Sequence, residues 1–367
     1  MPYAHITGWG MSVPEPVLTN DDISKMVETN DEWIRERTGI RERRIARASD
    51  FPSTLAVEAS FKALEVAGLA PGELDLIICS TSTPEYLFPA TACLIQDQLG
   101  ATKAGAFDLL AACTGFIFAM NMAAQSIRSG AIKNALVIGT ETLSRFVNWQ
   151  DRGTCILFGD GAGAFVLQAR DIPGGVLSAV MHSDGSGGDL LSLPGGGSRY
   201  PATEATVREG KHLIQMDGKG VFRFATKVMA SATEEALQLA GLKKEDIRWI
   251  VPHQANSRII EAAARGLKLP MERFIVNLER FGNTSTASIP IATVEAIEKG
   301  RFAPGDKIVF VGFGGGLTWG ALVAEWTGPS AGPHKIHPRR QRLWARIRSI
   351  FHRLERFLEG VIWGRRA

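Results

Sequence analysis

The sequence lacks several features that would place it in a specialised class. It has no run of about eighteen or more apolar residues, so we expect no membrane-spanning helix. The opening MPYAHITGWG has no basic segment followed by an apolar run, which argues against a secretory signal. The four cysteines, Cys79, Cys93, Cys113 and Cys155, include no CxxC pair, which argues against a zinc site or a disulfide framework. We therefore expect a protein of the reducing cytoplasm with no bound metal.

The glycine-rich segments lack the spacing of a nucleotide-binding loop. Neither FGDGAGA (158–164) nor GFGGGLTWG (312–320) contains GxGxxG or a glycine followed by Lys and Ser. The remaining composition, 45% hydrophobic and 22% charged, is typical of a soluble globular protein. A chain of 367 residues can form one large domain or two packed halves with a substantial core.

Positive charge is concentrated at the C-terminal end of the chain. Residues 328–367 contain ten Lys and Arg against two Glu, a net charge of +8, and the other residues carry −5. An acidic body with a basic tail argues against a nucleic-acid-binding enzyme. After Trp326, the segment TGPSAGPHKIHP is rich in Gly, Pro and Ser, which indicates a linker.

Beyond that linker, apolar residues with a strict four-three spacing predict one basic amphipathic helix. The stripe consists of Leu343, Ile347, Ile350, Leu354, Phe357 and Val361, and it is widened by Trp344, Phe351 and Leu358. Three surfaces can cover so large a stripe: the acidic body, the same helix of another subunit, or an anionic membrane. The spacing favours helix pairing, whereas the charge and the flanking Trp344 and Trp363 favour a lipid interface.

Two distant segments of the chain resemble each other at a constant offset of 173 residues. ALEVAGLAPGELDLIICS (63–80) and ALQLAGLKKEDIRWIVPH (236–253) share Ala, Leu, Ala, Gly, Leu and a later Ile. Each predicts the end of an amphipathic helix, a glycine stop and a buried strand. The interval is too long for a solenoid and indicates a duplicated α/β unit with parallel strands connected by helices. We expect one half over 1–172, a second over 173–327 and the tail over 328–367.

Cys113 has the sequence surroundings of a reactive thiol. It follows the strand-like run GAFDLLAA and precedes Thr-Gly and a long helical pattern. At such a turn, unpaired backbone N–H groups and the helix dipole favour the thiolate, which is the nucleophilic form. A cysteine in apolar surroundings is more often a small core residue, so the local pattern leaves both interpretations open. For Cys79, Cys93 and Cys155, which lie inside apolar or helical runs, we expect the core role.

His253 and Asn283 are two further candidate catalytic residues. His253 ends the buried strand RWIVPH and opens a polar QAN turn, although a lone histidine is more often a structural hydrogen-bonding residue. Asn283 lies in GNTSTAS, where a helix cap or a turn former is the alternative. Because α/β folds place their sites at strand ends and helix starts, Cys113 of one half and these two residues of the other predict a site at the seam.

Several motifs in order resemble the β-ketoacyl-acyl-carrier-protein synthase III family of the thiolase superfamily. They are TNDEWIRERTGIRERR, AACTGF, PHQAN, GNTSTASIP and GFGGGLTWG, and the resemblance extends over residues 3–326. It implies an α/β fold of duplicated βαβαβ halves in layered α/β/α/β/α packing, followed here by the C-terminal basic amphipathic helix. It also implies an acyltransferase that condenses an acyl-CoA primer, such as acetyl-CoA, with malonyl-acyl carrier protein by decarboxylation. The product would be 3-oxoacyl-acyl carrier protein, the start of fatty acid synthesis.

The resemblance assigns roles to the three candidate residues. Cys113 would hold the primer as a thioester, and His253 and Asn283 would donate hydrogen bonds to the malonyl thioester carbonyl as carbon dioxide leaves. Two preorganised donors stabilise the negative charge that develops there, so no metal and no separate cofactor is expected. The backbone N–H groups of Cys113 and Gly315 would form the oxyanion hole, where glycine permits close backbone approach.

The resemblance also implies binding residues. Trp33 and Arg152 would sandwich the adenine of coenzyme A, and Arg37 would contact its phosphates. Phe88 would reach the acyl pocket of a partner subunit, which implies a homodimer. Three arginines resemble the patch that docks the acidic carrier protein, namely Arg223, Arg258 and Arg265. Without the resemblance, Trp33 is a residue of a capped helix and these arginines are solvated surface charges.

Two departures and several alternatives accompany this interpretation. Thr114 stands where small residues are common, and the tail has no counterpart in typical family members. A thiolase would need a second cysteine in GFGGGLTWG, an elongating synthase a second histidine in place of Asn283, and plant-type polyketide synthases lack the TGIRERR signature. Papain-like proteases lack the duplicated α/β pattern. The acyl primer, a specialised pathway with a different primer, and a non-catalytic scaffold whose tail binds a membrane or partner remain open.

Overall fold

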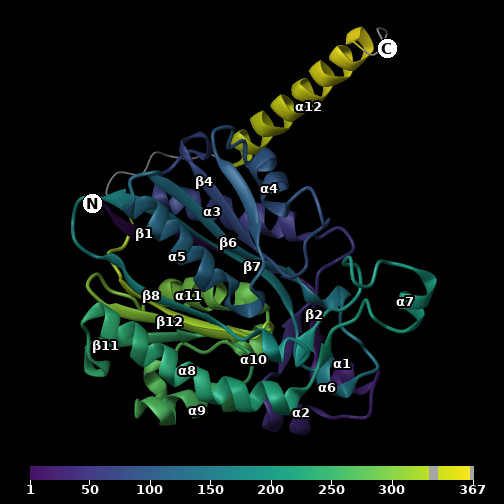
Figure 1. Ribbon diagram of the computed structural model, residues 1–367, viewed down its shortest axis with the longest axis vertical. Coiled ribbons are helices and arrows are strands. Elements are labelled where there is room, and N and C mark those ends of the chain that lie inside the picture. Colours follow the sequence, from purple (N-terminus) through teal and green to yellow (C-terminus); the bar gives the residue numbers. More distant parts are fainter. Residues whose placement is uncertain (330–337, 364–367) are drawn as a thin grey trace.

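Two β-sheets with helices between and outside them form the body of the molecule (Figure 1). The structure, a computed structural model, describes residues 1–329 and 338–363, so the predicted linker falls mostly outside the described residues. The first sheet consists of β1 (Tyr3–Ser12), β4 (Leu76–Ser80), β5 (Gly105–Leu109), β6 (Asn134–Thr142) and β7 (Asp160–Arg170). The second consists of β8 (Gly175–Ser183), β11 (Ile247–Pro252), β12 (Lys307–Gly314) and β13 (Thr318–Glu325).

The two sheets repeat one strand order. The first has the order β1-β7-β6-β4-β5 and the second, from the corresponding edge, β8-β13-β12-β11. An isolated parallel bridge between Ile250 of β11 and Phe274 stands where the first sheet has β5. The segments that resemble each other in sequence form the end of α3 (Pro52–Ala67) with β4, and the end of α8 (Gly218–Ala240) with β11. The duplicated thiolase-like halves predicted from the sequence are therefore present.

The sheets are mixed, whereas the sequence predicted parallel strands. β4 pairs in parallel with β5 and β6, but β7 pairs antiparallel with both β1 and β6. In the second sheet β12 and β13 are antiparallel, because only residues 315–317 connect them and a parallel pair needs a long crossover. The hydrophobic patterns predict which segments are buried strands, but they carry no information on the direction of those strands.

Helices occupy three layers around the sheets. Between the sheets lie α5 (Gly115–Arg128) and α11 (Ser288–Glu298), and α5 contacts strands of both. Outside the first sheet lie α3 and α4 (Thr91–Leu99), and outside the second lies α8 with α9 (Ser257–Leu267) packed against it. Phe116 of α5 and Phe310 of β12 both meet Phe165 of β7 edge-on, with ring centroids 5.1 and 6.1 Å apart. These aromatic contacts join the middle helix to both sheets.

Glycine allows α3 to lie close to β1. A Cβ atom on Gly10 would stand 2.3 Å from the carbonyl oxygen of Ala59 and 2.6 Å from Cβ of Lys62. Only hydrogen fits in that space, so the strand and helix backbones pack directly against each other.

The sequence predicts a core position for Cys93, and this prediction is wrong because Cys93 is exposed. α4 turns Ala92, Ile95 and Leu99 inward, and the helical period leaves Cys93 on the exposed outer face. Cys79 is buried in β4, and Cys155 is also buried. The error arose because a short apolar run in a helix has two faces.

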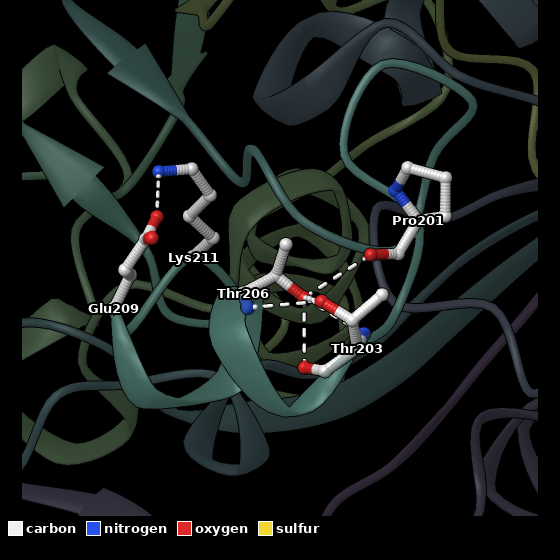
Figure 2. A network of polar contacts seen from close by, with 5 residues as sticks. All are labelled: Pro201, Thr203, Thr206, Glu209 and Lys211. Atoms are coloured by element: carbon white, nitrogen blue, oxygen red, sulfur yellow. Dashed lines mark hydrogen bonds and ion pairs between the residues drawn. The ribbon is translucent and has the colours of Figure 1, made fainter.

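A lobe between β8 and α8 stands beside the layered body. It contains β9 (Leu191–Ser192), α7 (Glu204–Arg208) and β10 (Gln215–Met216). Figure 2 shows how α7 is capped: the backbone N–H groups of Thr203 and Thr206 each donate to the other residue's hydroxyl, and the Thr206 hydroxyl donates to the Pro201 carbonyl. An ion pair between Lys211 and Glu209 closes the turn that follows. So short a helix needs such caps because its own hydrogen bonds stabilise it little.

Six small elements lie outside the layered body, namely β2 (Val17–Thr19), α1 (Asn20–Ser24), α2 (Asp31–Thr38), β3 (Glu42–Arg44), α6 (Arg152–Cys155) and α10 (Leu278–Phe281). Two of them, α2 and α6, contribute residues to the candidate site. Arg43 of β3 is fully buried and donates to the carbonyls of Leu18 and Ile156 and to the side chain of Asn20. This guanidinium joins the N-terminal segment to the end of α6.

The predicted C-terminal helix is present as α12 (Pro338–Trp363), which projects beyond the layered body from a base on α4 (Figure 1). No helix among the described residues is both long and apolar enough to cross a membrane. Across residues 1–329 and 338–363, no cluster of His, Cys, Asp and Glu side chains is arranged to hold a metal ion.

Candidate active site

A cavity of about 720 Å³ extends from the surface to the seam between the halves. Cys113, His253 and Asn283 line it and are buried, while Arg37 and Arg223 line it and are exposed. The three predicted catalytic residues thus meet in one cavity, although Cys113 lies more than a hundred residues before His253 and Asn283 in the sequence.

Cys113 sits in a tight turn between β5 and α5. The turn is a 3-10 helix, Ala112–Thr114, and Ala112 adopts a left-handed conformation with φ of 45°. The end of β12 lies directly against it, since a Cβ on Gly314 would stand 2.7 Å from the Cys113 nitrogen. The Thr114 hydroxyl is buried and lies 2.9 Å from the Thr318 hydroxyl. Thr114, the departure noted in the sequence, therefore links the cysteine turn to β13.

Burial keeps Cys113 protonated. The pKa of its thiol is raised to about 12, and the largest cause is the loss of solvent. Ser285 lowers this pKa by a smaller amount, and the charge of Glu141 raises it. The sequence had predicted that the helix start would favour the thiolate, and this expectation is wrong for the group as it stands, because desolvation is the largest effect.

His253 is held as a neutral hydrogen-bond donor. Burial lowers the pKa of its imidazole to about 3. Its Nδ1 lies 2.7 Å from the Ser288 hydroxyl, which already accepts a hydrogen bond from the backbone N–H of Gln254 at 3.3 Å. The Ser288 hydroxyl has one proton to donate, and we assign it to Nδ1, which is the acceptor beside it; this assignment places the imidazole proton on Nε2.

The carboxamide of Asn283 is oriented by the backbone around it. Its Oδ1 accepts the N–H of Ser285 at 2.8 Å, which assigns the oxygen and leaves the NH₂ group as the donor. Its own backbone is held by Leu157 and Gly159 of the other half, at 2.8 and 3.0 Å. Neither this amide nor the neutral imidazole can lose a proton near neutral pH, so together they suit a developing oxyanion.

Sequence reasoning missed a buried polar chain behind Cys113. Glu141 of β6 accepts hydrogen bonds from the Thr83 hydroxyl at 2.7 Å and from the Ser82 backbone at 3.1 Å. The Ser285 side chain interacts with both Glu141 and Cys113 and lowers the pKa of each, although burial has the larger effect on both. Burial raises the pKa of Glu141 to about 7. A signal was available, since Glu141 is a charge inside the buried-strand pattern NALVIGTET.

Of the residues predicted to bind coenzyme A, Trp33 and Arg37 line the cavity, and Arg152 lies against Trp33. The guanidinium groups of Arg37 and Arg152 lie 5.0 and 4.8 Å from the ring centroid of Trp33. Asn30 caps α2 and holds Trp33 at its first turn. Trp33 and Arg152 therefore contact each other directly, so a flat base would enter between them by displacing the guanidinium.

The remaining predicted residues occupy three different places. Arg223 of α8 and Arg258 of α9 line the rim of the cavity, whereas Arg265 lies further along α9 and pairs with Glu261 at 3.9 Å. Gly315 follows Gly314 in the loop beside Cys113, and its carbonyl accepts from Thr318. Phe88 is 86% exposed and does not line the cavity of its own chain.

A buried cysteine, a neutral histidine and an asparagine amide, meeting between two repeated α/β halves, fit a condensing enzyme of thiolase-like fold. Comparison with known proteins agrees. The family profile described as 3-oxoacyl-[acyl-carrier-protein (ACP)] synthase III matches residues 107–185, and the profile for its C-terminal part matches residues 237–326.

Full-length relatives and solved structures extend this match. The chain is 52% identical to β-ketoacyl-[acyl-carrier-protein] synthase III of a Roseiflexus species, covering 89% of this chain and 99% of that protein. The crystal structure of 3-oxoacyl-[acyl-carrier-protein] synthase III from Aquifex aeolicus is similar with a TM-score of 0.82 at 46% identity, covering 88% of this chain and 100% of that one. A priming β-ketosynthase of a polyketide biosynthetic pathway is similar with a TM-score of 0.83 at 36% identity, covering 89% of this chain and 97% of that one. The chain belongs to the β-ketoacyl-acyl-carrier-protein synthase III family and is an acyltransferase.

Proposed function

We propose that the protein condenses an acyl-CoA primer with malonyl-acyl carrier protein to give 3-oxoacyl-acyl carrier protein, initiating fatty acid synthesis. The observation that carries this proposal is the cavity in which the buried Cys113 thiol lies with His253 and Asn283, two neutral donors. The membership of the family supports it for the reaction as a whole.

The first half-reaction transfers the primer to Cys113. Its sulfur attacks the thioester carbonyl, the bond from that carbonyl to the sulfur of coenzyme A breaks, and the cysteine proton ends on the departing thiol. The backbone N–H groups of Cys113 and Gly315 would hold the oxyanion of the tetrahedral intermediate. Gly314, the residue before Gly315, approaches the Cys113 nitrogen closely, and this supports the pairing.

The second half-reaction forms the carbon–carbon bond. The malonyl thioester loses carbon dioxide, and Nε2–H of His253 and the NH₂ group of Asn283 stabilise the enolate oxygen. The enolate carbon then attacks the acyl carbonyl on Cys113, the carbon–sulfur bond breaks, and the released cysteine thiolate takes up a proton from solvent. Because the pKa of His253 is about 3, its imidazole is neutral near pH 7 and donates the hydrogen bond from Nε2 as an uncharged group.

The rim of the cavity suits the two carriers. Trp33, Arg37 and Arg152 would bind the adenine and phosphates of coenzyme A, which is a substrate here rather than a resident cofactor. Three exposed arginines would dock the acidic acyl carrier protein, namely Arg223, Arg258 and Arg265. Nucleic acid is not proposed as a partner.

A homodimer in the reducing cytoplasm is the assembly that we propose. β5 stands at the edge of the first sheet, and the nearby Leu87, Phe88 and Leu110 are exposed apolar side chains. A second copy could extend the sheet across this edge and cover them. The four cysteines are unpaired, which suits a reducing compartment.

The proposal is tested by trapping the acyl-enzyme. Incubation with labelled acetyl-CoA should place one acyl group on Cys113, and Cys113→Ser should abolish the label while the protein still unfolds cooperatively. Cys93→Ser is the matched control, since Cys93 is exposed and lies away from the cavity. Peptide mass spectrometry locates the thioester. An acyl group on Cys79, Cys93 or Cys155 would contradict the assignment.

A condensing enzyme with a different primer, serving a specialised pathway, is the second candidate. The similarity to a priming β-ketosynthase of polyketide biosynthesis favours it. A panel of acetyl, branched and longer acyl-CoA primers, each assayed with malonyl-acyl carrier protein, separates the two. Highest kcat/KM with acetyl-CoA supports the first candidate, and a strong preference for another primer supports the second.

A further inference from the structure

α12 contacts the body through its polar face. Ala345 is only 4% exposed and lies against Gly100, and the Ser349 hydroxyl donates to Asp97 of α4 at 2.8 Å. Arg342 pairs with Glu58 at 3.8 Å. Residues 342, 345 and 349 recur at helical spacing, so one face of the helix makes all these contacts.

The apolar stripe lies on the opposite face and is exposed. Consecutive residues of a helix are about 100° apart, which places Ala345 roughly opposite the stripe. Eight of its apolar side chains are 43–66% exposed, namely Leu343, Trp344, Ile350, Phe351, Leu354, Phe357, Leu358 and Val361. The acidic body, one of the three surfaces that the sequence left open, therefore does not cover the stripe in the described residues.

The residues beside the stripe argue against pairing with a second copy of the helix. In paired helices of four-three spacing, the flanking positions carry opposite charges that meet across the interface. Here Arg346 and Arg353 form one flank, and Trp344, Phe351 and Leu358 form the other. A second copy would bring arginine against arginine or against an apolar side chain, and no acidic residue stands on either flank to compensate.

An anionic lipid surface complements both features. Over residues 338–363 the helix has seven arginines and two glutamates, a net charge of +5. A bilayer takes up a wide apolar face as one continuous surface and attracts arginines at its edge, while Trp344 suits the interfacial layer. The body is attached to the face opposite the stripe and does not stand between the stripe and a membrane.

We propose that α12 docks the enzyme on an anionic lipid bilayer, with its apolar stripe in the headgroup region and its polar face toward the body. The proposal is independent of the catalytic assignment. The family profiles end at residue 326, and no residue of α12 lines the cavity.

The test is co-sedimentation of the full chain with vesicles of phosphatidylcholine, with and without phosphatidylglycerol. Binding is expected to the mixed vesicles at low salt and to weaken as salt screens the arginines. Ile350→Gln with Phe357→Gln removes two stripe side chains without changing charge and should weaken binding about a hundredfold. His352→Gln, on the face opposite the stripe, is the control and should change binding less than about twofold.

The opposite results overturn the proposal. Any one of three outcomes is sufficient. The full chain does not bind the mixed vesicles, it binds vesicles without phosphatidylglycerol equally well, or the variant Ile350→Gln with Phe357→Gln binds as strongly as the wild type. If the chain ignores vesicles and that double variant lowers its mass in sedimentation velocity, a second copy covers the stripe instead. Condensation of soluble substrates, measured on the same preparations, should be unchanged in the double variant and in His352→Gln, so a failed catalytic proposal would be seen separately.

Discussion

At the scale of single residues, burial decides the protonation state of the site. The pKa of Cys113 rises and that of His253 falls for one reason, since each neutral form survives desolvation better than its charged form. Histidine is thereby fixed as a donor and cysteine as a thiol. The sequence placed both residues correctly at the ends of strands, but it carried no information on solvent access, so the thiolate expectation was wrong.

The roles of His253 and Asn283 should be distinguishable from that of Cys113, because they act in different half-reactions. We expect His253→Ala and Asn283→Ala to be acylated on Cys113, but to decarboxylate malonyl-acyl carrier protein about a hundredfold more slowly, because each loses one oxyanion donor. Ser288→Ala should show the same pattern more weakly, since it releases the hydrogen bond at Nδ1. Single-turnover acylation and release of labelled carbon dioxide measure the two steps. Wild-type decarboxylation in both alanine variants would refute these roles.

Glu141 should make stability depend on pH. Its pKa is about 7 in the folded protein against an ordinary 4.5, so the folded state binds the proton more tightly. Proton binding by Glu141 therefore contributes at most about 3 kcal/mol to the free energy of unfolding. This contribution is fully present below pH 4.5 and is lost as pH rises to about 7. Glu141→Gln should remove this loss. The measurement is the free energy of urea unfolding of both proteins at several pH values. A constant difference between them across this range would contradict the assignment.

At the scale of secondary-structure elements, local pattern predicted what is local. The helix-strand pairs of the repeat and the amphipathic α12 follow from periodicity within short windows. Strand direction did not follow, because β1 pairs with β7 across about 160 residues. The orientation of α12 did not follow either, since Ala345 and Ser349 lie in an unremarkable polar stretch and their partners on α4 are distant in sequence.

The contact between β1 and α3 offers a prediction at this scale. Gly10→Ala should lower the free energy of unfolding by about 2 kcal/mol, because its Cβ would overlap the backbone of Ala59. Gly72→Ala is the control, as nothing lies within 4 Å of the added Cβ and the unfolded chain loses freedom. Urea unfolding measures both. Equal stabilities would show that the two elements can move apart without cost.

At the scale of the whole molecule, the pattern of exposed apolar side chains points to an assembly. Phe107 of β5 is exposed near Leu87, Phe88 and Leu110, at the one edge of the first sheet that has no counterpart in the second. The repeat explains why this edge differs, because the second sheet stops at an isolated bridge where the first adds a full strand. That extra strand gives the chain an edge on which a second copy can pair.

We expect the chain to have near twice its 39.7 kDa mass in sedimentation velocity, and Phe107→Asp to reduce it to one copy. A charge buried in a sheet-extending interface would be left without a partner. Leu239→Asp, at an exposed apolar position on α8, is the control and should leave the mass unchanged. Phe88→Ala should keep the mass but alter the ranking of acyl-CoA primers, because Phe88 is exposed and does not line the active-site cavity of its own chain, so in the proposed dimer it would reach that of the neighbour. A dimer that survives Phe107→Asp would place the interface elsewhere. An unchanged primer ranking in Phe88→Ala would then remove the reason for a shared pocket.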